Sequence, residues 1–174
     1  MAHTIHLRDV TRSDHPRILE LNEASVQYLS PLTPESLQWL HDAAAYRRVV
    51  VDEGEIVAFL LALREGSAYE SPNYRWFART YDRFLYIDRV VVASRSRGAG
   101  IGRLLYADVF AFAGEAQVTR VTCEYDIDPP NDASRRFHEG FGFREVGTQS
   151  VAAGTKRVSL QAVALPPEGT AVHR

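Results

Sequence analysis

Cysteine is scarce in this sequence, and a basic excess and long apolar runs are absent. A single cysteine among 174 residues excludes an intramolecular disulfide framework and a multi-cysteine zinc site. Lysine and arginine number 20 against 22 aspartates and glutamates, whereas nucleic-acid-binding proteins usually carry a basic excess. No apolar run approaches the ~20 residues that span a bilayer, and "MAHTIHLRDV" lacks a signal-peptide pattern. We therefore expect a cytoplasmic protein that binds neither nucleic acid nor membrane.

The length and the apolar patterning predict one domain of mixed α and β structure. Alternation and turn residues predict strands over 4–10, 83–93 and 120–127, and hairpins over 47–63 and 143–163. Helical spacing and capping residues predict helices over 16–26, 34–45, from the glycines to 116, and 131–141. A strand–glycine–helix–strand order predicts one parallel pair in an otherwise antiparallel sheet. The domain is expected to span residues 1–164, with a frayed tail over 165–174.

A glycine-rich stretch, "SRSRGAGIGRLLY" at residues 94–106, precedes one predicted helix. The N–H groups of residues 98–103 are expected to face an anion at the positive end of that helix. Arg97 or Arg103 can add charge-assisted contacts to a pyrophosphate. A Walker loop is excluded because Gly102 is followed by Arg103 and not lysine, and a dinucleotide fingerprint fails at its sixth position. A glycine-rich helix start that binds nothing remains an alternative.

Two motifs in this sequence resemble those of the GNAT superfamily of N-acetyltransferases. The run Arg97-Gly98-Ala99-Gly100-Ile101-Gly102 is similar to the family's acyl-CoA loop, Arg/Gln-x-x-Gly-x-Gly/Ala. A second motif has its matching positions at Asn131, Ser134, Phe137, His138, Gly142 and Phe143. It departs from the family at Ser134, where alanine is usual, and at His138, where tyrosine is usual. The resemblance covers residues 4 to about 163 and implies an α+β GNAT-like domain, with a splayed parallel pair and helices on both faces of the sheet.

The resemblance also implies acetyl-CoA as the co-substrate. The histidines other than His138 show no metal-ligand spacing, so no metal site is expected. The main chain at Val90 and Val92 is expected to pair with the pantetheine arm, and one of these N–H groups to bind the oxyanion. The acceptor is expected to be a primary amine, on a small molecule or a peptide. The expected cofactor-binding residues are Val90, Val91, Val92, Arg97, Gly98, Ala99, Gly100, Ile101, Gly102, Arg103, Asn131, Ser134 and Phe137.

Three residues are candidates for proton transfer. Asp88 lies two residues before Val90, so regular alternation places it on the same face of the strand and favours it as the base. Glu124, on the following strand, is the second candidate. His138 stands where the family has a tyrosine and is the candidate acid. The structural alternatives are an ion pair between Asp88 and Arg89 and a surface position for His138.

The sequence leaves three further questions open. Cys123 in an apolar strand is expected to be a core residue and not a nucleophile. The aromatic segment 67–84 is expected to wall the acceptor pocket, cover a sheet edge or form a dimer contact, in that order. The expected function is acetyl transfer to an amine by direct attack. A catalytically silent acyl-CoA-binding domain and a nucleotide-binding module are the alternatives, and either a monomer or a homodimer is compatible with the sequence.

Overall fold

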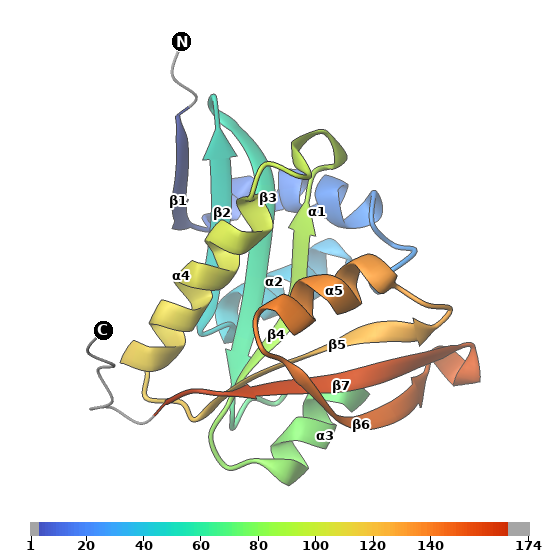
Figure 1. The fold of residues 1–174 in the computed structure, drawn as a ribbon. Coiled ribbons are helices and arrows are strands. Elements are labelled where there is room, and N and C mark those ends of the chain that lie inside the picture. The colour runs from blue at the N-terminus through green and yellow to red at the C-terminus, as the bar shows by residue number, and fades with distance from the viewer. Residues whose placement is uncertain (1–3, 167–174) are drawn as a thin grey trace.

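The computed structural model describes residues 4–166, which form a seven-stranded sheet flanked by helices (Figure 1). The strands are β1 (Ile5–Asp9), β2 (Tyr46–Asp52), β3 (Glu55–Arg64), β4 (Leu85–Val92), β5 (Arg120–Asp128), β6 (Arg144–Val151) and β7 (Lys156–Ala164). The α-helices are α1 (His15–Glu23), α2 (Pro34–Ala43), α3 (Pro72–Thr80), α4 (Ile101–Glu115) and α5 (Asp132–Gly140). Short 3₁₀ turns are η1 (Arg12–Asp14), η2 (Ser94–Ser96) and η3 (Ala152–Gly154).

The strands lie in the order β1-β2-β3-β4-β5-β7-β6, and β4 and β5 form the parallel pair. These two strands pair only where Leu85 meets Val121 and Tyr86 meets Thr122, and then they diverge. The sheet therefore opens between its two halves, as the ribbon shows (Figure 1). The predicted fold class, with its splayed parallel pair, is confirmed.

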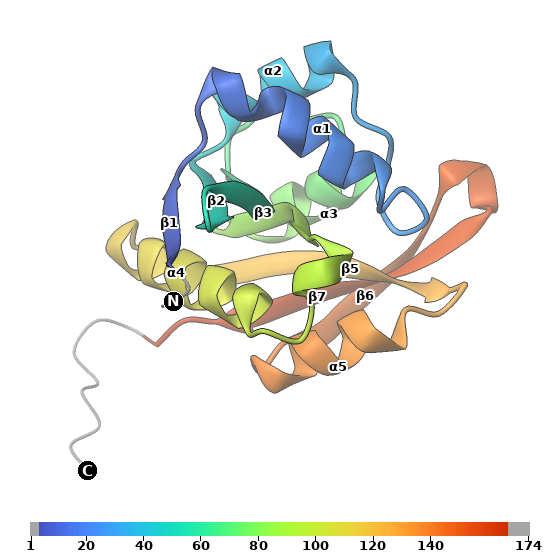
Figure 2. The same ribbon diagram turned by 90° about the horizontal axis from the view of Figure 1, so that it is seen from above.

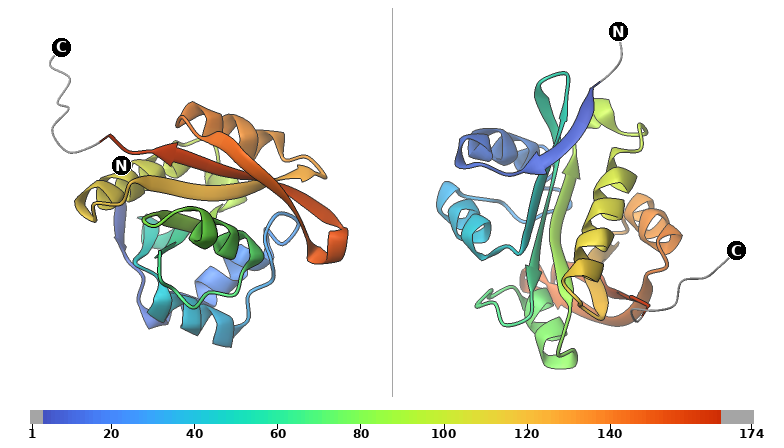
Figure 3. Two further views of the ribbon diagram at one scale, coloured as in Figure 1. Left: turned by 90° about the horizontal axis from the view of Figure 1, so that it is seen from below. Right: turned by 90° about the vertical axis from the view of Figure 1, so that its left-hand side faces the viewer.

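Helices cover both faces of the sheet (Figure 2). One face carries α1, α2 and α3, whose buried residues join one apolar cluster that includes Leu37 and Phe77. The other face carries α4 and α5, and Leu105 and Val109 of α4 are at the centre of a second cluster. The two side views show the same division (Figure 3). The opening between β4 and β5 thus connects two faces with different linings.

An extra residue in β4 breaks its alternation. Leu61 of β3 pairs with Arg89 and Ala62 pairs with Ile87, so Asp88 has no partner of its own and forms a β-bulge. Asp88 and Arg89 consequently point to the same face, that of α1–α3, whereas Val90 packs on the α4 side. The expectation that Asp88 shares a face with Val90 is wrong, because it assumed a regular strand.

The aromatic segment contains a helix that the sequence analysis did not predict. Ser71 caps α3 by accepting the Tyr74 N–H, and Pro72 takes the first helical position. Tyr74 and Phe77 are buried in the core of the α1–α3 face. The segment therefore covers a sheet face, while residues at its start reach the opening between β4 and β5.

The ends of the described region and its helix lengths complete the fold. The Leu165 N–H donates to the Thr119 carbonyl at 3.0 Å, and the rest of the expected tail lies outside the described residues. Between residues 4 and 166, no helix is both long enough and apolar enough to cross a membrane. The first helix ends at Glu23, earlier than expected, and residues 24–33 form a loop that leads to α2.

Candidate active site

A cleft of about 1090 Å³ lies where β4 and β5 diverge. Its lining comes from the α1–α2 loop, the start of α3, β4, the glycine loop, β5 and α5. The three residues expected to transfer protons, Asp88, Glu124 and His138, all line it. Every residue expected to bind the cofactor lines it as well, with the exception of Ala99. The fold therefore brings the two sequence motifs together around one cavity.

The three glycines of the loop have different structural roles. Gly98 and Gly100 adopt φ angles of +81° and +79°, a left-handed conformation that side chains disfavour. Gly100 is the N-cap residue of α4, so the first N–H groups of that helix have no intrahelical partner. Gly102 has a normal φ, but a Cβ there would lie 3.3 Å from the Phe137 ring. Only the first two glycines shape the turn, and the third allows α4 to pack against α5.

Glu124 of β5 is a cleft residue with one unpaired carboxylate oxygen. Its Oε1 accepts the Tyr86 hydroxyl at 2.9 Å, while Oε2 is shielded from solvent and has no hydrogen-bond partner among the described residues. Burial, with the charge of Asp88 adding to it, raises the pKa of Glu124 to about 8. A carboxyl group with that pKa exchanges protons near neutral pH, as a general base must.

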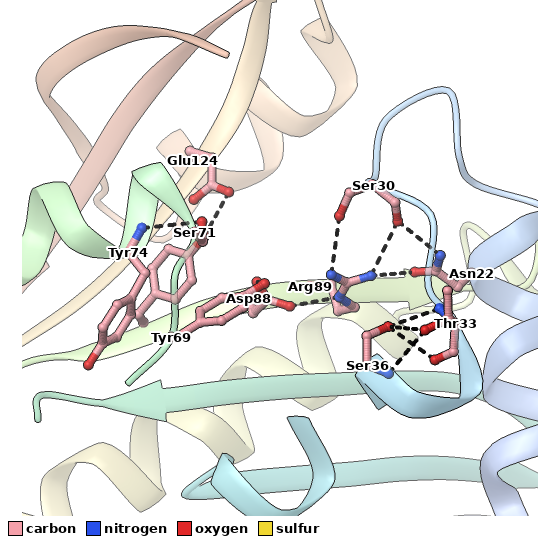
Figure 4. A network of polar contacts seen from close by, with 11 residues as sticks. Asn22, Ser30, Thr33, Ser36, Tyr69, Ser71, Tyr74, Asp88, Arg89 and Glu124 are labelled. Carbon is pink, nitrogen blue, oxygen red and sulfur yellow. Dashed lines mark hydrogen bonds and ion pairs between the residues drawn. The ribbon is translucent and has the colours of Figure 1, made fainter. Parts of the chain in front are cut away.

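Asp88 is held more tightly than Glu124. Its Oδ2 pairs with Arg89 Nε at 2.7 Å, and its Oδ1 accepts the Tyr69 hydroxyl at 2.7 Å (Figure 4). The Asp88 and Arg89 side chains are 5% and 4% exposed. Both oxygens of Asp88 are therefore engaged, and the ion pair that the sequence analysis raised as an alternative is present.

His138 is buried, with 4% of its surface exposed, so the alternative of a surface position is wrong. Its Nδ1 lies 2.7 Å from the Ser134 carbonyl oxygen, which only accepts, so Nδ1 carries the proton. Nε2 must then accept the Tyr106 hydroxyl at 2.6 Å. Burial lowers the pKa of His138 and favours this neutral form.

Tyr106 of α4 is a cleft residue that the sequence analysis missed. Its ring is fully buried and its hydroxyl bonds to His138. Its helical position directly after the glycine loop was the signal available, because α4 turns that position toward α5. The sequence motif for α5 named His138 but not its partner.

The remaining groups to consider are Cys123 and the side chains that could bind a metal. Cys123 is buried in the cluster beneath α4, and burial raises the pKa of its thiol. This agrees with the prediction of a core residue, since a protonated thiol is a poor nucleophile. Within residues 4–166, no group of three or more His, Cys, Asp or Glu side chains is placed to hold a metal ion.

Comparisons with known proteins agree with this geometry. Residues 9–143 match the model of the acetyltransferase (GNAT) family. A phosphinothricin N-acetyltransferase of Streptomyces coelicolor is 36% identical over 123 residues, which cover 68% of this chain and 66% of the relative, slightly less than two thirds of its length. Ard1 from Thermoplasma volcanium aligns with a TM-score of 0.77 at 17% identity, over 94% of this chain and 99% of its own. The ribosomal-protein-S18-alanine N-acetyltransferase of Escherichia coli aligns with a TM-score of 0.72 at 12% identity, over 98% and 100%. At these identities, the two solved structures show a shared fold.

Proposed function

The chain belongs to the acetyltransferase (GNAT) family, and we propose that it transfers the acetyl group of acetyl-CoA directly to a primary amine. The observation that carries the proposal is one cleft that is lined both by the glycine loop and by Glu124, whose Oε2 has no hydrogen-bond partner among the described residues. An acyl donor held at the loop and an amine held at Glu124 would meet in the opening between β4 and β5.

The cofactor half of the cleft suits coenzyme A. The left-handed turn at Gly98 and Gly100 leads into the N-terminus of α4, an arrangement that favours a pyrophosphate. The edge of β4 beyond Tyr86 is not paired with β5. We propose that the main chain of Val90 and Val92 binds the pantetheine arm along this edge, and that one of these N–H groups binds the oxyanion.

The acceptor half supplies the base. We propose that the Glu124 carboxylate, once its buried Oε2 turns toward the cleft, takes the proton of the amine while the nitrogen attacks the thioester carbonyl. The new C–N bond forms, a tetrahedral oxyanion develops, and the C–S bond breaks as the oxyanion collapses. In this scheme Asp88 is not the base, because both its oxygens are engaged. Its negative charge acts on Glu124, whose pKa it helps to raise.

We propose that Tyr106 gives the departing thiolate its proton, and that His138 positions the Tyr106 hydroxyl. In the free protein His138 has no N–H to offer, because Nδ1 donates to Ser134 and Nε2 accepts from Tyr106. The Tyr106 O–H must therefore turn from His138 toward the sulfur before it can donate. Tyr106→Phe is then expected to lower kcat about 10-fold or more where chemistry limits turnover. His138→Ala should lower it less. A large loss in His138→Ala with little loss in Tyr106→Phe would assign the acid to His138 itself.

Phosphinothricin is the first acceptor to test, because the curated relative is named for it. Purified protein would be mixed with acetyl-CoA and a panel of amines that includes phosphinothricin, amino acids and short peptides, and CoA release followed. We expect acetylation of at least one amine, with Glu124→Gln as the inactive control. Binding of acetyl-CoA without turnover of any amine would instead indicate a silent acyl-CoA-binding domain. Thermal stabilisation by ATP or NAD but not by acetyl-CoA would indicate a nucleotide-binding module.

A further inference from the structure

The loop between α1 and α2, residues 24–33, forms one wall of the cleft on the face where Glu124 lies. In the view from above, it comes down from α1 toward the hairpin of β6 and β7 (Figure 2). Val26 and Tyr28 of this loop line the cleft although they are 37% and 46% exposed. Large apolar side chains left uncovered on a cavity wall are suited to contact a bound molecule.

Arg89 ties this loop to β4. Its Nη1 donates to Asn22 Oδ1 at 2.9 Å and to the Ser30 carbonyl at 3.4 Å, and its Nη2 donates to Ser30 Oγ at 3.3 Å (Figure 4). Asn22 of α1 donates to the same Ser30 carbonyl at 3.1 Å. Since Arg89 also pairs with Asp88, one buried cation joins the loop to the bulge of β4.

Lys156 ties the loop to β7 in the same way. Its Nζ donates to the Gln27 carbonyl at 3.0 Å and pairs with Asp126 Oδ2 at 3.3 Å. Asp126 is on β5, two residues after Glu124. Lys156, Asp126 and Glu124 all line the cleft. Each of the two ties therefore consists of a cleft carboxylate, a cation and a loop carbonyl.

We propose that Arg89 and Lys156 are positioning residues for the acceptor, which fix the α1–α2 loop over the cleft by binding the carbonyls of Ser30 and Gln27. This inference rests on the proposed function, because it places the acceptor amine on the side of Glu124. The two cations anchor the loop at points three residues apart, from strands on opposite sides of the opening. The loop is thereby held at a fixed distance from Glu124. The conformational entropy of ordering the loop is then lost before the acceptor binds and not on binding.

Lys156→Met is the sharper test of the two, because Lys156 is 27% exposed whereas Arg89 is 4% exposed and its loss would leave Asp88 unpaired deep in the fold. Lys156→Met also removes the ion-pair partner of Asp126, so Asp126→Asn is measured beside it. Lys156 is partly exposed, so solvent competes for its hydrogen bond to the loop and screens its charge. We therefore expect KM for the amine to rise about threefold to tenfold, with kcat and KM for acetyl-CoA within about twofold. Lys156→Arg should restore most of the loss, and Ser30→Ala should weaken the second tie in the same direction.

Arg157→Met is the matched control. Arg157 is the next residue of β7, is exposed, and donates to Thr148 Oγ1 of β6 and not to the loop. The Arg157→Met variant should leave KM for the amine and KM for acetyl-CoA unchanged. Hydrogen–deuterium exchange adds a readout that needs no turnover, since residues 24–33 should exchange faster in Lys156→Met, with α5 unaffected.

An unchanged exchange rate over residues 24–33, or an equal rise in both KM values, would overturn the inference. If no amine is turned over, the proposed function fails and the exchange measurement alone decides whether Lys156 holds the loop. Faster exchange of the whole protein in Lys156→Met would assign the residue a general structural role and contradict the proposal.

Discussion

Replacement of Glu124 by glutamine is expected to make the protein more stable at alkaline pH and much less active. The pKa of Glu124 is raised from 4.5 to about 8 in the folded protein. The folded chain therefore keeps a proton that the unfolded chain releases between these two values. Stability contributed by this group is fully present below pH 4.5 and is lost as the pH rises toward and through 8.

The size of the effect follows from the shift. One pKa unit corresponds to 1.36 kcal/mol, so the rise to about 8 implies about 4–5 kcal/mol between the two pH limits. Glutamine cannot ionise, and its variant should lack this loss. Because 1 kcal/mol moves the Tm of a domain of this size by about 2–4 °C, the difference in Tm between the variant and the wild type should widen measurably from pH 5 to pH 8.5.

The same substitution tests the base. Loss of general base catalysis is expected to lower kcat/KM for the amine by about 10²–10⁴-fold and to remove any rise of the wild-type rate through a pKa near 8. Glu115→Gln, at the exposed end of α4, should change neither stability nor rate. Parallel pH–stability curves for the wild type and Glu124→Gln, with activity within a few-fold, would refute the assignment.

Three further substitutions separate binding, packing and chemistry. Gly100→Glu is expected to abolish acetyl-CoA binding in calorimetry. Gly54→Glu has the same left-handed strain in an open turn and should leave binding intact. Equal affinity in both variants would argue against an anion site at the loop. Gly147→Ala should destabilise the protein by about 1–3 kcal/mol in denaturant titrations, because a Cβ there would lie 2.7 Å from the Trp76 ring. Trp76→Ala in the same protein should recover part of the lost stability. Cys123→Ala is expected to cost about 1 kcal/mol and to retain activity, so an acetylated Cys123 that forms at the rate of turnover would contradict direct attack.

The sequence predicted most elements along the chain and the glycine turn before α4 well, because both depend on local rules. Apolar alternation marks a strand wherever it occurs, and glycine spacing before a helix reports backbone geometry directly. The aromatic residues of segment 67–84 do not by themselves indicate a helix. The Ser71-Pro72 pair is a helix start signal, and it identifies α3 without tertiary information.

The acceptor half was less predictable, because it depends on contacts between distant residues. Asp88 shares a face with Val90 only in a regular strand, and nothing local in the sequence marks the bulge of β4 that turns Asp88 to the side of Arg89. Likewise, the sequence places Tyr106 just after the glycine loop, but only the fold shows that its hydroxyl bonds to the ring of His138, 32 residues later. Pairing across the fold decides which atoms remain free to react.

The division of the cleft between two faces supports direct attack over a route through an acyl-enzyme. Glu124 and Cys123 are neighbours on β5, so they point to opposite faces, one toward Tyr86 and the other into the cluster beneath α4. An amine deprotonated by Glu124 would therefore approach from the α1–α3 face, while the thiolate would depart on the α4–α5 face, beside Tyr106. Pairing between β4 and β5 stops after Tyr86, and the passage between these faces opens at that point. Cys123 also lines the cleft, but burial raises the pKa of its thiol, and a protonated thiol is a poor nucleophile. A transfer through Cys123 would therefore need a thiolate that the fold disfavours, whereas direct attack needs only the opening between β4 and β5.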